Sequence, residues 1–331
     1  MTGDIRAVIT GTGSFLPDKI LTNEDFERMV DTSDEWITTR TGIKTRHIAD
    51  GGMTTSDMAS AAGKRALRDA GVKPKDVELV IVATFTGDRP LPACACFVQE
   101  KLGLENAGAF DLAAACSGFV YGTASAWGLI ASGIYRNILV IGADHLSAFT
   151  DYTDRTSCIL FGDGAGAALV QAAPNETERG ILTCSLGADG GGADMMTVYA
   201  GGSELPTSEE TVRNRRHYMV IRGREVFKFA ALKMQELVKA SVEACHLTID
   251  DVKLVVPHQV NTRILNFAAE KLGLPKEKLY VNIDRVANTS AASIPIALDE
   301  AAQAGMIETG DVIVLVAFGG GLTWASMVLR W

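Results

Sequence analysis

Amphipathic helical stretches alternate with fully apolar strands along this chain. Residues 64–83, KRALRDAGVKPKDVELVIVA, predict a helix with one apolar face, a short polar turn and a buried strand. Residues 239–258, KASVEACHLTIDDVKLVVPH, repeat this pattern. Two further pairs of similar segments follow in the same order: 132–144 with 304–318, and 161–170 with 318–329. Such self-similarity predicts an internally duplicated α/β fold.

The duplication divides the chain into two predicted halves, residues 1–175 and 176–331. Alternating helices and apolar strands predict sheets that are covered by helices, and a site at the junction of the two halves. The Gly-rich and charged stretch 187–217 is interpreted as a surface excursion over that junction. The repeats are spaced more widely in the first half, and we place its extra residues at 84–110.

Composition and charge exclude several classes of protein. The 331 residues are 47% hydrophobic and 21% charged, which is ordinary for a soluble globular protein. The longest apolar runs, 138–143 and 312–318, are too short to span a bilayer, and no signal peptide is recognisable, so we expect a cytoplasmic protein without a membrane contact. The net charge of −9 disfavours nucleic-acid binding.

Cysteine usage indicates a reducing compartment. None of the six cysteines forms a C-x-x-C pair, and most lie in apolar segments. Cys94 and Cys96 have no matching Cys/His pair elsewhere, so small core residues are a better interpretation than half of a metal site. We predict no metal.

Cys116 is the candidate nucleophile. It lies in AFDLAAACSGF, where a strand end is followed by small residues and then by a helical pattern. The start of a helix presents unpaired N–H groups and partial positive charge, which we expect to lower the pKa of the thiol and to bind an oxyanion. For an isolated cysteine, a buried core thiol is the competing interpretation.

His258 and Asn288 are the candidate polar partners. His258 follows the apolar strand LVVP, and strand ends are favoured places for catalytic groups in α/β proteins. Asn288 lies in the polar turn RVANTSAAS. Taken singly, each has a structural alternative: a core histidine, and an N-cap or turn asparagine.

A redox enzyme is a weaker hypothesis. Gly162, Gly164 and Ala167 match the dinucleotide pattern GxGxxA, but no acidic residue follows at the required distance within a clean βαβ unit. The glycines are better explained as a turn that is repeated at 319–321. We predict no cofactor.

Four separated motifs, AAACSGF, VPHQVNTRI, NTSAASIP and AFGGGLTW, resemble the β-ketoacyl-acyl-carrier-protein synthase III branch of the thiolase-like condensing enzymes. The resemblance spans nearly the whole chain and implies a five-layered α-β-α-β-α fold with internal duplication. It implies decarboxylative Claisen condensation of a CoA-linked acyl primer with malonyl-acyl-carrier protein, initiating fatty acid biosynthesis. Cys116, His258 and Asn288 match the catalytic set, and the N–H groups of Cys116 and Gly320 match the oxyanion hole.

The resemblance also implies where substrates and partners bind. Acyl-CoA is a substrate and not a cofactor, and a homodimer is expected. Leu91 occupies an acyl-pocket position where acetyl-primed members carry Phe. The remaining matches fall into two groups: coenzyme A contacts at Trp36, Arg40, Arg155, Phe227 and Asn261, and carrier-protein docking at Lys228, Arg263 and Lys271.

Three further positions depart from the family pattern. Ala287 and Ala325 stand where Gly is usual, and we expect both to keep an ordinary backbone, since a Cβ is unfavourable at positive φ. Arg224 replaces a usual Asn near the pantetheine path.

Two other functions remain open. The first is a ketosynthase or acyltransferase of specialised, polyketide-type metabolism within the same family. The second, from a different class, is a non-catalytic acyl-binding protein, which the intact Cys–His–Asn set disfavours. Thiolase and hydroxymethylglutaryl synthase relatives use a second Cys or a catalytic Glu at other positions.

Overall fold

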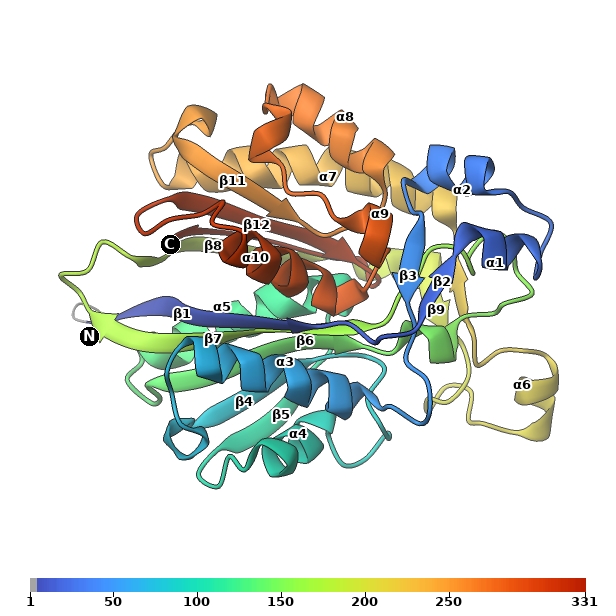
Figure 1. Cartoon of the computed structure of the whole chain (residues 1–331), viewed down its shortest axis with the longest axis horizontal. Helices are drawn as coiled ribbons and strands as arrows, with labels where there is room; N and C mark the ends of the chain where they lie inside the picture. The colour runs from blue at the N-terminus through green and yellow to red at the C-terminus, as the bar shows by residue number, and fades with distance from the viewer. Residues whose placement is uncertain (1–4) are drawn as a thin grey trace.

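Two mixed sheets lie one above the other in the computed structural model, which describes residues 5–331 except the side chain of Arg224 (Figure 1). The first sheet has five strands in the order β1-β7-β6-β4-β5, and the second has four in the order β11-β12-β13-β8. The strands of the first sheet are β1 Ile5–Phe15, β4 Leu79–Ala83, β5 Gly108–Leu112, β6 Asn137–Asp144 and β7 Gly164–Pro174. Those of the second are β8 Gly180–Ala188, β11 Val252–Pro257, β12 Val312–Gly319 and β13 Thr323–Arg330.

Helices cover both outer faces and fill the space between the sheets (Figure 1). Helices α3 and α4 pack on the first sheet, α7 and α8 on the second, and α5 and α10 lie between them. The helices are α1 Asn23–Glu27, α2 Asp34–Thr41, α3 Thr55–Asp69, α4 Cys94–Leu102, α5 Gly118–Ala131, α6 Glu209–Arg213, α7 Gly223–Ala244, α8 Thr262–Leu272, α9 Ile283–Val286 and α10 Ser293–Gln303. Two small two-stranded antiparallel sheets complete the fold: β2 Ile20–Thr22 with β3 Thr45–His47, and β9 Met196–Val198 with β10 Met219–Ile221.

The apolar core follows these layers. A central cluster joins side chains of both sheets, such as Val140 and Leu315, with Phe119 of α5 and Leu298 of α10. Separate clusters lie under α3 and α4 and under α7 and α8. Strands β4, β6, β11 and β12 are therefore buried on both faces, which explains their continuous apolar sequences, whereas the edge strands β5 and β8 are partly exposed. The expected five-layered α-β-α-β-α arrangement is confirmed.

The duplication is visible in the strand pairing. In the first sheet, β4 is parallel to β6, and β6 is antiparallel to β7. In the second, β11 is parallel to β12, and β12 is antiparallel to β13. The paired segments of the sequence thus form equivalent elements.

The location that we expected for the extra residues of the first half is wrong. Residues 84–110 contain α4, and α8 follows β11 in the same way that α4 follows β4. The halves differ after β6, because residues 145–163 separate β6 from β7, whereas only 320–322 separate β12 from β13. Apolar periodicity does not reveal an irregular insertion of this kind.

One glycine sets the distance between the first sheet and the central layer. A Cβ on Gly142 of β6 would lie 2.1 Å from the carbonyl oxygen of Ala291, far inside any real contact. Glycine is required here so that the turn before α10 rests directly on the strand.

The boundary between residues 175 and 176 stays a prediction. It falls between β7, the last strand of the first sheet, and β8, which belongs to the second. Across residues 5–331, no helix has the length and apolar character needed to cross a membrane.

Candidate active site

Cys116 lies in a single 3₁₀ turn, Ala115–Ser117, that leads into α5. Ala115 has a left-handed backbone (φ 47°), and this sharp turn places the thiol at the start of the helix. The end of β12 lies against it, since a Cβ on Gly319 would be 2.7 Å from the Cys116 nitrogen. The predicted position at a helix N-terminus is confirmed.

The expectation of a lowered thiol pKa is not met in the ligand-free chain. Cys116 is only 5% exposed, and burial raises the pKa of its thiol to about 12. The Ser290 side chain opposes this shift, and the buried Asp144 adds to it. Desolvation outweighs the helix N-terminus because the negative thiolate has lost its water. The Cys116 thiol is therefore neutral in the ligand-free chain.

His258 directly follows β11, and its backbone N–H donates to the carbonyl of Val316 on β12 (2.8 Å). The ring is buried and meets Phe318 edge to face at 5.7 Å. Burial lowers the pKa of the imidazole to about 3. His258 is thus neutral, with one ring N–H to donate.

Asn288 is held by both its backbone and its side chain. Its N–H donates to Leu160 (3.1 Å), and its carbonyl accepts from Gly162 (3.0 Å). The side-chain Oδ1 accepts from the N–H of Ser290 (2.9 Å). The Nδ2 group is therefore the end of the amide left for a ligand.

The structure brings these three residues together. Cys116 from the first half, and His258 and Asn288 from the second, line one small cavity beneath β12. Gly319, which precedes the predicted oxyanion glycine Gly320, lines it too. The other lining residues are apolar: Met196, Val226, Phe229, Val260, Phe318 and Leu322.

A larger cavity of about 520 Å³ adjoins this small one. Met196, Val226, Val260 and Asn288 line both, so the two spaces are separated only by shared side chains. Of the residues expected to contact coenzyme A or the carrier protein, four line the larger cavity: Arg40, Phe227, Asn261 and Arg263.

Trp36 contacts two guanidinium groups beside this cavity. The guanidinium carbons (Cζ) of Arg40 and Arg155 are 5.1 Å and 5.2 Å from the centre of the Trp36 ring. Arg155 also pairs with the exposed Asp31 (3.0 Å). Two cations over one indole form a cation–π cluster that is suited to a planar base and to phosphate.

Asn261 has a structural role that the sequence did not reveal. It is the N-cap of α8, where its Oδ1 accepts from the N–H of Arg263 (2.9 Å). Its Nδ2 donates to the carbonyl of Arg40 (2.9 Å). The side chain thus joins α8 to α2 and positions the two arginines of the cavity.

The expected docking residues lie on two neighbouring helices, Lys228 on α7 and Arg263 and Lys271 on α8. Arg263 stacks on Phe227 (5.7 Å) at the cavity, and Lys228 is exposed on the same helix as Phe227. Lys271 lies in the last turn of α8, about 12 Å along the helix from Arg263. It stacks on Phe267 there, away from the cavity.

Leu91 is not in an acyl pocket of the single chain. Its side chain is 83% exposed, and it lines neither the small cavity nor the larger one. The loop between β4 and α4 carries it outward.

The two alanine departures differ. Ala325 lies within β13 with ordinary backbone, as expected. The expectation for Ala287 is wrong: it is fully buried with φ 58° and ψ −157°, a region that favours glycine. The strained backbone directly precedes Asn288. Arg224 belongs to α7, but its side chain lies outside the described part.

The apolar walls of the cavities were missed by sequence reasoning. Met196, Val226, Val260 and Phe161 come from four distant segments. Each looks like an ordinary core residue in its own segment, so only the tertiary fold identifies it.

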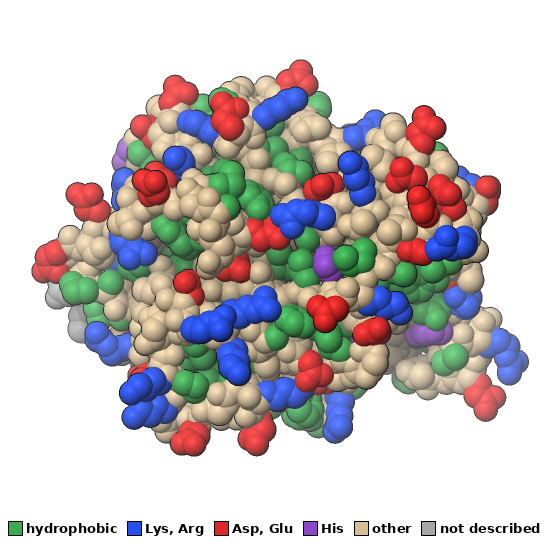
Figure 2. All heavy atoms as spheres, in the orientation of Figure 1, with side chains coloured by type: hydrophobic (Ala, Val, Ile, Leu, Met, Phe, Trp, Pro, Cys, Tyr) green, Lys and Arg blue, Asp and Glu red, His purple; other side chains and the backbone are tan. Residues whose placement is uncertain are grey.

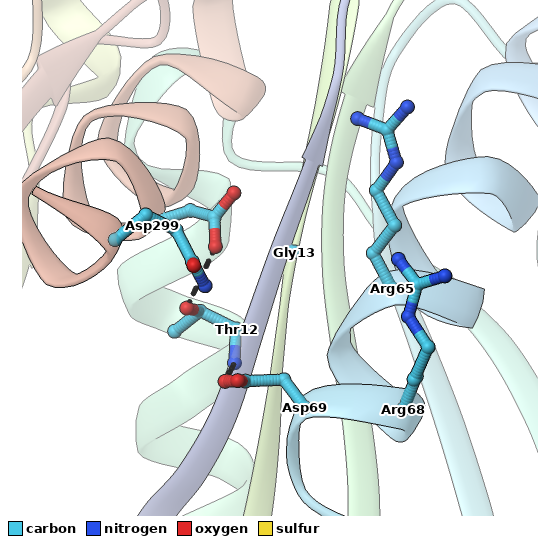
Figure 3. A pocket seen from close by; sticks show the side chains of 7 residues that line it. Thr12, Gly13, Arg65, Arg68, Asp69 and Asp299 are labelled. Atoms are coloured by element: carbon cyan, nitrogen blue, oxygen red, sulfur yellow. Dashed lines mark hydrogen bonds between the residues drawn. The ribbon is translucent and has the colours of Figure 1, made fainter.

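A separate hollow of about 560 Å³ lies between α3 and α10 along the open edge of β1 (Figure 3). The N–H of Thr12 donates there to Asp69 (2.9 Å), and its hydroxyl donates to Asp299 (2.8 Å). These carboxylates cover polar groups of an edge strand. None of the predicted site residues lines this hollow. The described residues also contain no cluster of His, Cys, Asp or Glu suited to a metal ion.

A buried thiol at a helix start, with His and Asn from the second half of a duplicated five-layered fold, defines a thiolase-like condensing enzyme. The family model "3-Oxoacyl-[acyl-carrier-protein (ACP)] synthase III" matches residues 110–190, and its C-terminal counterpart matches 242–331. The chain belongs to this β-ketoacyl-acyl-carrier-protein synthase III family and is an acyl-transferring condensing enzyme.

Relatives and solved structures agree with this assignment. A β-ketoacyl-acyl-carrier-protein synthase III of Caldanaerobacter subterraneus is 54% identical, over 100% of this chain and 99% of the relative. The 3-oxoacyl-acyl-carrier-protein synthase III of Aquifex aeolicus superposes with a TM-score of 0.90 at 45% identity, covering 98% of this chain and 100% of the other. The priming β-ketosynthase of a polyketide pathway has a TM-score of 0.91 at 32% identity, covering 100% and 97%.

Proposed function

We propose that this enzyme condenses a CoA-linked acyl primer with malonyl-acyl-carrier protein through an acyl group carried on Cys116. The observation that carries the proposal is the convergence of Cys116, His258 and Asn288 on one small cavity that adjoins a larger one. The first half supplies the nucleophile, and the second supplies two neutral hydrogen-bond donors.

Acyl transfer is the first step. The sulfur of Cys116 attacks the thioester carbonyl, the bond from that carbon to the CoA sulfur breaks, and the thiol proton ends on the released CoA. Because the resting thiol is neutral, the proton leaves as the new bond forms. The N–H groups at the start of α5 then stabilise negative charge on sulfur and on the carbonyl oxygen.

Decarboxylation is the second step. The bond between the malonyl carboxylate and its α-carbon breaks, carbon dioxide leaves, and the electron pair moves toward the thioester oxygen. His258 and Asn288 donate hydrogen bonds to that oxygen, a role for which a neutral imidazole and a free Nδ2 group are suited. The burial that keeps His258 neutral therefore serves this step directly.

Carbon–carbon bond formation completes the cycle. The carbanion attacks the acyl carbon on Cys116, and the tetrahedral oxyanion is held by the N–H groups of Cys116 and Gly320. Cys116 leaves as a thiolate and takes up a proton, which restores the neutral thiol. The residues present carry every step, so the proposal includes no cofactor.

Substrate binding follows the larger cavity. We propose that Trp36 and Arg155 hold the adenine of CoA, that Arg40 binds phosphate, and that Phe227 lines the route of the pantetheine arm. Lys228 and Arg263 flank this cavity and are proposed to attract the acidic carrier protein by charge. Lys271 lies about 12 Å from Arg263 along α8, so its role in docking has less structural support.

A homodimer also belongs to the proposal. Among residues 5–331, strand β5 pairs only with β4, so its other edge is open there, and Phe110 on it is partly exposed. An open edge with exposed apolar side chains is suited to pairing with a second copy. Leu91 lies in the neighbouring loop, so we propose that it completes the acyl pocket of the partner copy.

Mass spectrometry of the intact protein tests the proposal. Incubation with acyl-CoA is expected to add one acyl group per chain, located on Cys116, and the Cys116→Ala variant is expected to remain unlabelled. Labelling on another cysteine, or none, contradicts the mechanism. Binding of acyl-CoA without labelling is the outcome that a non-catalytic acyl-binding protein predicts.

A role in polyketide-type metabolism is the second candidate, and the polyketide priming ketosynthase with a similar fold is the observation that favours it. Relatives with higher identity carry the synthase III name. A panel of primers from acetyl to longer and branched acyl-CoAs separates the two functions by the preferred acyl group.

A further inference from the structure

The hairpin of β9 and β10 carries a long excursion, residues 199–218, that holds the short helix α6. The base of the hairpin belongs to the substrate site, because Met196 and Ile221 line the larger cavity. The part around α6 projects from the body of the molecule, where Figure 2 shows cationic and anionic side chains interspersed. The proposed function gives the region around α6 no role.

Arg215 ties the excursion to another segment. Its Nε donates to Oδ2 of Asp151 (2.7 Å), and its Nη2 pairs with Oδ1 of the same carboxylate. The guanidinium also lies 4.8 Å from the ring of Tyr218, and the Arg215 backbone is left-handed (φ 57°). A bidentate pair that is also stacked has a defined geometry, unlike most ion pairs on a surface.

Asp151 begins the loop that presents Arg155. Its Oδ1 accepts from the N–H (2.9 Å) and hydroxyl (2.6 Å) of Thr153, which closes a tight turn. On the inner side, Tyr152 stacks on Phe26 with ring centres 6.2 Å apart. The loop is thus held inward by an aromatic pair and outward by Arg215.

This loop lies in the connection between β6 and β7 that has no counterpart in the second half. It bears Arg155, which stacks on Trp36, and Thr156, which lines the larger cavity. The Arg215–Asp151 pair therefore acts on Arg155, which is proposed to hold adenine, and not on the thiol, His258 or Asn288.

We infer that Arg215 is a positioning residue for donor recognition: through Asp151 it holds the loop that places Arg155 over Trp36. The inference rests on the proposed function, since it assumes that Trp36 and Arg155 bind the nucleotide end of CoA. Loss of the pair then weakens binding of donors that carry the nucleotide and leaves the chemistry unchanged.

The test compares Arg215→Gln with Arg213→Gln. Arg213 is an exposed residue of the same excursion and forms no ion pair within residues 5–331, so its variant loses the same charge. Steady-state kinetics are measured with acyl-CoA and with acyl-pantetheine, which lacks the nucleotide. For Arg215→Gln, KM for acyl-CoA is expected to rise about 3- to 10-fold with kcat unchanged. KM for acyl-pantetheine is expected to stay constant, and Arg213→Gln is expected to change neither value.

Asp151→Asn gives a second, independent variant. Asparagine keeps the Oδ1 acceptor for Thr153 and replaces Oδ2, the acceptor for Arg215 Nε, by an NH2 group that cannot accept, so the charge and one of the two hydrogen bonds to Arg215 are lost. The same rise in KM for acyl-CoA is expected, and the double variant is expected to show no further rise, because both changes remove one interaction. Full additivity contradicts the inference.

Trp36→Ala distinguishes failure of the proposed nucleotide site from failure of the role inferred for Arg215. If it leaves KM for acyl-CoA unchanged, the proposed nucleotide site itself is wrong. If Trp36→Ala raises that KM while Arg215→Gln behaves like Arg213→Gln, only the role of Arg215 is overturned. If Arg215→Gln raises KM for both acyl-CoA and acyl-pantetheine, the role of Arg215 is also overturned, because such a rise indicates a general effect on the cavity.

Discussion

The backbone N–H of Ser290 donates a 2.9 Å hydrogen bond to Oδ1 of Asn288, and this contact orients the amide. With Oδ1 occupied, Nδ2 is the end that remains for a ligand. Asn288 is thus set as a donor before any substrate binds. Such preorganisation is what makes stabilisation of an oxyanion effective, because little reorientation is needed as charge develops.

Replacing Asn288 by Asp keeps the acceptor for Ser290 and exchanges the donor for a carboxylate oxygen. Decarboxylation of malonyl-acyl-carrier protein is expected to fall by at least about 100-fold, because the donor is lost and a second anion faces the enolate. Acylation of Cys116 is expected to persist. Carbon dioxide release and intact mass measure the two steps, with the exposed Asn175→Asp as control. Unchanged decarboxylation contradicts the role of Asn288.

The raised pKa of the Cys116 thiol predicts how its alkylation depends on pH. Only the thiolate reacts with iodoacetamide, and with a pKa of about 12 its population is small at neutral pH. The rate at Cys116 is therefore expected to rise about tenfold per pH unit from pH 7 to 9, without a plateau. Peptide mass spectrometry separates this rate from those of the other cysteines. A plateau near neutral pH is the result expected if the helix N-terminus governs the thiol.

Leu91→Phe tests the proposed contribution of one copy to the acyl pocket of the other. The larger ring is expected to lower kcat/KM for long and branched primers by about 10-fold or more and to leave acetyl-CoA unaffected, because even a single methylene in an apolar pocket changes kcat/KM by about 10-fold or more. Ile134→Phe, at another exposed apolar position, is the control. Identical primer profiles for both variants count against a pocket role for Leu91.

Ala287→Gly tests the strained backbone before Asn288. Glycine relieves about 1–3 kcal/mol of strain, but it loses a buried methyl group and gains entropy in the unfolded chain. The free energy of unfolding is expected to change by less than about 1 kcal/mol. Ala268→Gly, in the interior of α8, is expected to be clearly destabilising, because no strain is relieved there. Equal losses in denaturant titrations contradict the strain at Ala287.

The layers of the fold were predictable because strands such as β4, β6, β11 and β12 are buried on both faces and outer helices such as α3 and α8 bury one apolar face. In repeats such as 64–83 and 239–258, the apolar pattern therefore indicates which faces of the helix and strand are buried. The connection 145–163 was not located, because it has no periodicity and is defined only by its absence from the other half. Composition does not distinguish it from any other polar loop.

The chemistry-bearing residues of the site were predictable from motifs, whereas their environment was not. Cys116, His258 and Asn288 stand in distinctive local sequences. The raised pKa of the thiol depends on burial by segments far apart in the chain. The left-handed backbone of Ala287 and the ion pair of Arg215 with Asp151 likewise depend on long-range packing.

The long connection between β6 and β7 makes this duplicated enzyme modular. Residues 151–156, which present Arg155, bond to one another, to Asp31 and to Arg215, whereas Leu160 and Gly162 of the same connection hold the backbone of Asn288. Swapping residues 151–156 between relatives together with the excursion that bears Arg215 is therefore a route to synthases that accept a different acyl donor, because Leu160 and Gly162, which hold Asn288, stay in place.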